Sequence, residues 1–247
     1  SSLESNAIVT SKKMSDVSSK TKIVAIIQAR MRASRLPNKM MLDLHGQPII
    51  NWVFQRTRKA RHLSEIVFAL PKTNTDDTLA DHLVDLGAKI FRGSETDVTE
   101  RYFHAANEHQ ATHIVRICAD NPFVSGSEID RLIQFYFESE CDYAYNHIPK
   151  NNRYPDGIGA EMVSIQVLQD IHKEANTSEQ REHIFNFIWA HPERFKICTF
   201  DPSDERLAHP NLKLDIDTKQ DYENLCRMKI NIEMEAYQII AAAQAIK

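Results

Sequence analysis

The feature that most constrains the fold is a continuous apolar segment, Ile23 to Ile27, with polar residues on both sides. A short run of this kind is typical of a strand that is buried on both faces, as in a parallel sheet. Three further strand patterns follow, and helical periodicity lies between and after them. The strand patterns are 65–70, 88–91 and 113–118, and the helical ones begin near residue 48 and cover 76–86, 97–109 and 125–137. This alternation predicts right-handed βαβ units and an α/β fold with a mostly parallel central sheet.

The regular alternation ends near residue 140. The remaining patterns are strands at 142–146, 161–165 and 195–200 and helices at 178–190, 219–229 and 233–246. They predict a small mixed lobe over about 141–200, followed by closing helices. No repeat or linker interrupts 21–247, so we expect a single domain there. Residues 1–20 are rich in Ser and Lys without periodicity, and we expect a disordered leader or tag.

Composition excludes several classes of protein. The chain has 247 residues, 42% apolar and 26% charged, which is ordinary for a globular protein, and its net charge of −4 provides no global basic field for nucleic acid. No apolar run approaches the roughly 18 residues of a membrane span. The four cysteines form no CxxC pair, and scattered thiols fit a reducing compartment. We therefore expect a cytoplasmic protein without nucleic-acid or membrane partners.

The loop after the first strand reverses the charge of the chain locally. It carries four basic residues, and no acid occurs between 22 and 43: Arg30, Arg32, Arg35 and Lys39. Open α/β sheets bind ligands at this end of a strand, and arginine forks match phosphate oxygens. The loop therefore predicts a polyphosphate site, the alternative being a solvated basic loop. Neither GxxxxGK[ST] nor GxGxxG is present, which argues against P-loop enzymes and dinucleotide dehydrogenases.

Four blocks of sequence resemble a known family in the right order. Residues 26–39 read IIQARMRASRLPNK, and they are followed by FRGSETD at 91–97 with Arg101-Tyr102, VRICADNP at 115–122 and REH at 181–183. The set resembles the acylneuraminate and deoxy-octulosonate cytidylyltransferases of the CMP-sugar synthetase superfamily, and is most similar to the spore-coat-polysaccharide branch.

The resemblance implies a Rossmann-like nucleotidyltransferase fold and a homodimer with contacts through the smaller lobe. It implies transfer of CMP from CTP to an acidic sugar of the 2-keto or nonulosonic type, with Mg²⁺ and release of pyrophosphate, in bacterial surface polysaccharide or glycan biosynthesis. A sugar-nucleotide-dependent glycosyltransferase and an inactive nucleotide-binding homologue are the alternatives.

The resemblance also implies roles for particular residues. The nucleotide is expected to contact Ala29, Arg30, Ser34, Arg35, Lys39, Arg92, Arg101 and Asp120, with Arg30, Arg35 and Lys39 also stabilising the leaving pyrophosphate. Mg²⁺ is expected on Asp120 and Asp217. The sugar is expected to contact Glu161, Gln180, Arg181 and His183 in the small lobe. No general base is assigned.

The two aspartates also have ordinary structural explanations. Asp217 precedes a helix and is the expected N-cap, with Gln220 completing a capping box, and Asp120 precedes Pro122, as in an Asx turn. Asp215 and Asp217 form a DxD, the metal motif of many glycosyltransferases, although its late position argues against that interpretation.

Two departures from the family stand out. Relatives usually carry Asp where this chain has Gly159, which places the sugar contact in doubt or points to a different substrate. Asn38 replaces a glycine of the phosphate loop, and Asn tolerates left-handed backbone better than most residues.

Overall fold

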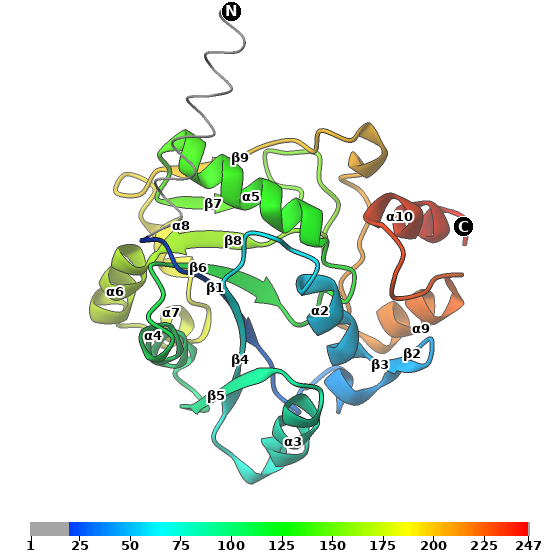
Figure 1. Ribbon diagram of the computed structural model, residues 1–247, viewed down its shortest axis with the longest axis horizontal. Coiled ribbons are helices and arrows are strands. Elements are labelled where there is room, and N and C mark those ends of the chain that lie inside the picture. Colours follow the sequence, from blue (N-terminus) through cyan, green and yellow to red (C-terminus); the bar gives the residue numbers. More distant parts are fainter. Residues whose placement is uncertain (1–19, 247) are drawn as a thin grey trace, which may run out of the picture.

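A seven-stranded sheet with the order β5-β4-β1-β6-β8-β7-β9 forms the centre of the protein (Figure 1). The computed structural model describes residues 20–246, so the expected leader at 1–20 lies almost entirely outside it. Strands β5, β4, β1 and β6 are parallel, and β8 is antiparallel to both of its neighbours. The predicted α/β class with a mostly parallel sheet is confirmed.

The elements follow the predicted positions closely in the first 140 residues. The strands are β1 (Ile23–Gln28), β4 (Glu65–Pro71), β5 (Lys89–Gly93), β6 (His113–Cys118), β7 (Tyr143–Tyr145), β8 (Glu161–Ser164) and β9 (Ile197–Thr199), with a small pair β2 (Asp43–Leu44) and β3 (Gln47–Pro48). The helices are α2 (Ile49–Thr57), α3 (Asp77–Asp85), α4 (Val98–Glu108), α5 (Gly126–Ser139), α6 (Ile165–Glu174), α7 (Ser178–Glu182), α8 (Asn186–Ala190), α9 (Lys219–Arg227) and α10 (Ala236–Gln244).

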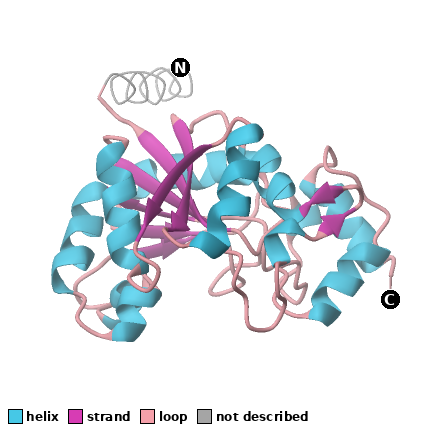
Figure 2. Cartoon of the chain, turned by 90° about the horizontal axis from the view of Figure 1, so that it is seen from below, coloured by secondary structure: helices cyan, strands magenta, loops and turns pink. Residues whose placement is uncertain are grey.

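Helices cover both faces of the sheet (Figure 2). Alternate residues of β1 enter different cores: Ala25 and Ile27 pack on the side of α2, α3 and α5, and Val24 and Ile26 pack on the side of α4 and α6. All four are fully buried. This two-sided burial is the reason that the strand reads as a continuous apolar run. No helix within residues 20–246 has the length and apolarity required to cross a membrane.

The chain changes direction across the sheet at β1. From β1 it proceeds outward through β4 to β5, and it then returns to β6 on the other side of β1. The loops that follow β1 and β6 therefore separate at the same edge of the sheet, which is where α/β folds form ligand crevices.

Several sequence expectations need correction in the second half. The predicted helix 178–190 is two short helices, because His183 leaves the helical conformation with φ −115° and ψ 85°. Helix α6 there and the β2–β3 pair in the first half were not predicted. The three strands predicted at 142–146, 161–165 and 195–200 are present as β7, β8 and β9, and they extend the central sheet.

The Ser125-x-x-Glu128 pattern predicts a capping box at the N-terminus of α5, and only half of it forms. Ser125 Oγ accepts a hydrogen bond from the backbone of Glu128, 3.3 Å away. The Glu128 carboxylate instead accepts from Tyr154 Oη at 2.7 Å, so it does not complete the predicted capping box. Burial raises the pKa of Glu128, and this second bond partly offsets the cost of burial.

Gly159 leaves no room for the aspartate that relatives usually carry. A Cβ atom there would lie 2.1 Å from Asn146 Oδ1 and 2.3 Å from Asn146 O. The Asn146 side chain is held in place by the backbones of Ala160 and Glu128, at 2.9 and 3.1 Å. The fully buried Asn146 thus fills the space beside Gly159, and a side chain at 159 requires a different packing of this segment.

Gly159→Ala is expected to lower the free energy of unfolding by about 3 kcal/mol, because the new Cβ must push a backbone carbonyl. Gly87→Ala is the control: Gly87 has φ 84° but open space around it, so it tests backbone strain alone, about 1 kcal/mol. Urea unfolding measures both. Equal losses in the two variants would show that Asn146 yields without cost.

Candidate active site

A cavity of about 330 Å³ lies at the carboxyl ends of β1 and β6. The loop after β1 forms one wall, the end of β6 forms another, and His183 and Asp217 close it from later parts of the chain. The position is the one that the reversal of chain direction creates, and it joins residues that are up to about 190 positions apart in the sequence.

The basic loop is anchored at its start, and the side chains in its middle are largely exposed. Ala29 N donates to Ala69 O at 3.2 Å, and Met31 N donates to Asp76 Oδ1 at 2.7 Å. Near its other end, Asn38 takes the left-handed conformation with φ 57°, as its replacement of glycine predicts. Ala29, Arg30, Ser34, Arg35 and Lys39 all line the cavity, so the expected phosphate-binding side chains lie together.

Lys39 is the buried cation of the cavity. Its Nζ lies 2.7 Å from Asp120 Oδ1 and donates to Ile216 O at 3.2 Å. The side chain is only 9% exposed, whereas that of Asp120 is 38% exposed. Because a buried ammonium without partners is costly, these two oxygens offset the cost of burying Lys39 at the edge of the sheet.

Arg35 and Asp217 form a second, more exposed ion pair. Arg35 Nη1 donates to Asp217 Oδ2 at 2.6 Å, and the two side chains are 68% and 43% exposed. Exposed pairs of this kind stabilise the fold by about 1 kcal/mol or less. The Arg35–Asp217 pair therefore contributes little to the stability of the fold. A ligand can separate its two groups at a correspondingly small cost.

A backbone hydrogen bond holds the two aspartate loops together. Ile216 N donates to Asp120 O at 2.8 Å, which places Asp217 beside the end of β6. The N-cap of α9 is Thr218, which forms a capping box with Asp221. The expectation that Asp217 caps this helix with Gln220 is therefore wrong by one residue, and the Asp217 carboxylate is free to face the cavity.

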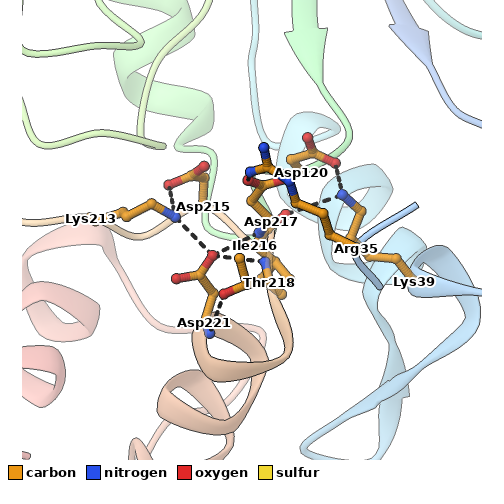
Figure 3. A network of polar contacts seen from close by, with 9 residues as sticks. All are labelled: Arg35, Lys39, Asp120, Lys213, Asp215, Ile216, Asp217, Thr218 and Asp221. Atoms are coloured by element: carbon orange, nitrogen blue, oxygen red, sulfur yellow. Dashed lines mark hydrogen bonds and ion pairs between the residues drawn. The ribbon is translucent and has the colours of Figure 1, made fainter. Parts of the chain in front are cut away.

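The two aspartates of the DxD face different surroundings (Figure 3). Asp215 Oδ1 pairs with Lys213 at 3.1 Å, and it does not line the cavity as Asp217 does. Burial and the charge of Asp215 raise the pKa of Asp156 to about 6, against the effect of Lys213. The DxD therefore does not present two carboxylates to one ligand, which weakens the glycosyltransferase alternative.

The acidic residues of the cavity suit a divalent cation that shares its ligands with a nucleotide. Within residues 20–246, no group of three or more His, Cys, Asp or Glu side chains is arranged to hold a metal alone. Mg²⁺ commonly takes one or two carboxylates and completes its shell with water and phosphate oxygens. Asp120 and Asp217, which both line the cavity, fit that chemistry.

Arg116 and Glu161 form a buried ion pair beyond the phosphate loop. Arg116 Nη1 donates to Glu161 Oε2 at 2.6 Å, and Tyr143 Oη donates to Glu161 Oε1 at 2.6 Å. Burial would raise the pKa of Glu161, but the charges of His147 and Arg116 and these hydrogen bonds hold it below its ordinary value. The ionised acid in turn keeps Arg116 charged, with its side chain 22% exposed beside the cavity.

Four residues of the expected site lie outside the cavity. The side chains of three of them bind other parts of the protein: Arg92 binds Asp77 and backbone carbonyls, fully buried Arg101 binds the carbonyls of Ser94 and Glu95, and Arg181 binds Asp97 and His172 O. The backbone carbonyl of the fourth, Gln180, accepts from Thr99 Oγ1. None of the four lines the cavity. Of the residues expected to contact the sugar, His183 lines the cavity. Glu161 does not line it, but it binds Arg116, which does.

Four cavity residues with polar or ionisable side chains were not predicted: Gln28, Arg116, Cys118 and Glu182. The first three carry a signal that periodicity could have revealed. Gln28 pairs with Cys118 in register, and Arg116 lies two positions earlier on the same face of the sheet. Polar side chains at the carboxyl end of otherwise apolar strands indicate a site. Burial raises the pKa of Cys118 to about 12, as does the nearby charge of Asp120, so its thiol stays protonated.

Comparisons with known proteins show the family of this chain. A family model described as cytidylyltransferase matches residues 24–242. The spore coat polysaccharide biosynthesis protein SpsF of Bacillus subtilis is 33% identical over 208 residues, which cover 82% of this chain and 84% of that protein. An uncharacterized protein of Methanocaldococcus jannaschii is 32% identical over 82% of this chain and 81% of its own length.

Solved structures share the fold. A cytidylyltransferase from Leptospira borgpetersenii has a TM-score of 0.82 at 25% identity, covering 92% of this chain and 95% of its own. A CMP:2-keto-3-deoxy-manno-octonic acid synthetase in complex with CTP has a TM-score of 0.60 at 17% identity, covering 83% and 97%. The predicted nucleotidyltransferase fold is confirmed.

Asp156→Asn is expected to stabilise the protein at neutral pH but not in acid. The native pKa of about 6 lies above the ordinary 3.8, so the native state binds the proton more tightly. Its contribution is therefore fully present below pH 4 and lost as the pH rises towards 6. With allowance for solvent screening, we expect a gain of about 1 kcal/mol at pH 7.5. Urea unfolding at pH 4 and 7.5 measures it, and an equal gain at both values would exclude the carboxylate charge as its cause.

Proposed function

Because this chain belongs to the cytidylyltransferase family, we propose that it transfers CMP from CTP to an acidic sugar and releases pyrophosphate, in the biosynthesis of a surface polysaccharide or glycan. The observation that carries the proposal is the cavity in which a basic loop faces two aspartates. The functions of relatives support the sugar and the pathway: one acts in spore coat polysaccharide biosynthesis, and another, 34% identical over 45% of this chain, is a 3-deoxy-manno-octulosonate cytidylyltransferase of Geobacter sulfurreducens.

The residues of the cavity suit an in-line transfer. A sugar hydroxyl attacks the α-phosphorus of CTP, and the bond to pyrophosphate breaks. Arg30, Arg35 and Lys39 neutralise the charge that grows on the leaving group, and this preorganised charge is where such enzymes gain most of their rate. Mg²⁺ held by Asp120 and Asp217 with phosphate oxygens would neutralise further charge and acidify the attacking hydroxyl.

The other end of the cavity suits the acceptor. Arg116 is the cavity-lining cation outside the phosphate loop, and Glu161 and β6 fix its orientation. Only one of its nitrogens donates to Glu161. A planar guanidinium with free donors matches a carboxylate, which supports an acidic acceptor. His183 lines the same cavity, and we expect it to contact the same sugar. The homodimer and the magnesium dependence stay predictions.

The proposal predicts that pyrophosphate is released when the protein is given CTP, Mg²⁺ and an acidic sugar from a panel that includes deoxy-octulosonate and acylneuraminates. CTP should support faster release than ATP or GTP. Asp217→Asn should lower the rate about 100-fold or more, because one group that stabilises the transition state is lost. Its melting should change little, since Asp217 is exposed and caps no helix.

Two results would contradict this proposal in different ways. Faster release with GTP than with CTP would exclude the cytidylyl specificity. Tight binding of CTP without pyrophosphate release over the whole panel would favour an inactive nucleotide-binding homologue.

Arg116→Lys is expected to raise the KM for the acidic sugar about 10- to 100-fold and to leave the KM for CTP unchanged. Lysine keeps the charge that buried Glu161 needs but loses the planar fork. Arg153→Lys is the matched control, because Arg153 forms a similar pair with Glu205 at 2.8 Å on the exposed surface. An equal rise in the KM for the sugar and the KM for CTP would show that Arg116 maintains the shape of the cavity and does not bind the acceptor.

A further inference from the structure

Two ion pairs cross the cavity and connect its basic loop to its two aspartates (Figure 3). Lys39 reaches Asp120 at 2.7 Å, and Arg35 reaches Asp217 at 2.6 Å. Two of the groups expected to bind phosphate are therefore already paired, one to one, with the two groups expected to bind metal. Without a ligand, each side of the site neutralises the other.

This pairing is unfavourable for a metal ion that arrives alone. A divalent cation at Asp120 and Asp217 would have to displace an ammonium and a guanidinium, and both would then remain close to it without a counter-charge. Lys39 is the more costly of the two, because its buried Nζ would keep only Ile216 O as a partner.

A triphosphate changes this balance. Arg32 pairs only with Glu95, at a long 3.4 Å, and within the described chain no carboxylate lies within 4 Å of Arg30. Arg30 and Arg32 can therefore bind a polyphosphate without first breaking a strong ion pair. Further phosphate oxygens can then draw Arg35 and Lys39 from the aspartates, which leaves two carboxylates next to bound phosphate.

We propose that Arg35 and Lys39 act as placeholders for the metal: they occupy Asp217 and Asp120 until the nucleotide triphosphate takes them over, so that the divalent cation binds only together with the nucleotide. The proposal rests on the proposed function for the identity of the two ligands. Because such coupling is reciprocal, the metal strengthens nucleotide binding by the same factor as the nucleotide strengthens metal binding.

Direct titration with Mn²⁺, followed by the electron paramagnetic resonance signal of the free ion, tests the placeholders without nucleotide, sugar or turnover. Wild-type protein is expected to bind Mn²⁺ alone only weakly. Lys39→Met, which keeps the length of the side chain but not its charge, should tighten this binding at least about 10-fold. Arg35→Gln should do the same, and it changes an exposed residue, so the test stands even if Lys39→Met does not fold.

Two controls separate a placeholder from a general charge effect. Arg32→Gln removes one positive charge from the same loop but frees neither aspartate, so it should gain much less than Arg35→Gln. Arg35→Gln combined with Asp217→Asn should lose the gained binding, which would assign the Mn²⁺ to that carboxylate.

Tight Mn²⁺ binding by the wild-type protein alone would overturn the proposal, and so would equal gains in Arg32→Gln and Arg35→Gln. Failure of the proposed function has a different signature. If the variants gain Mn²⁺ binding as expected, but the wild-type protein neither binds CTP nor turns it over, the placeholder proposal stands and the assignment as a cytidylyltransferase falls.

Discussion

The parallel pairing of β1 with β6 is the constraint on which the rest of the site depends. The pairing aligns Gln28 with Cys118, so the loops that follow both strands leave the sheet at one level. Because the chain reverses direction across the sheet between these strands, helices do not fill the space between the two loops. The basic loop and Asp120 therefore face each other, and the backbone bond from Ile216 to Asp120 adds Asp217 to the same edge.

The electrostatics of the cavity follow from the same arrangement. A protein with a net charge of −4 gathers its phosphate-binding cations in one loop and places two carboxylates within reach of them. Ion pairs join the two groups across the cavity. A nucleotide and a metal ion would separate the same pairs, so the strength of the pairs and the affinity for the ligands are coupled.

Arginines outside the phosphate loop mostly bind other parts of the protein around the site rather than line the cavity. Arg181 joins α7 to Asp97 at the start of α4, and Arg101 holds the loop at 94–95. Both arginines belong to sequence blocks that resemble the family. Their side chains donate hydrogen bonds to carboxylate and carbonyl oxygens of the protein itself. Only Arg116 turns a cation from a strand towards the cavity, and Glu161 and Tyr143 determine its orientation.

The sequence by itself determined the class of fold and the phosphate loop. Buried parallel strands read as continuous apolar runs, and a cluster of four basic residues without an acid is visible in any chain, because both signals are local. Tertiary structure decided the rest. The N-cap of α9 is not part of that rest, because the Thr218–Asp221 capping box is local and the sequence could have revealed it. The fold split the helix at His183, filled the space at Gly159 with Asn146 and brought Arg116 to the cavity. Neither composition nor periodicity records which distant side chain will occupy a given space.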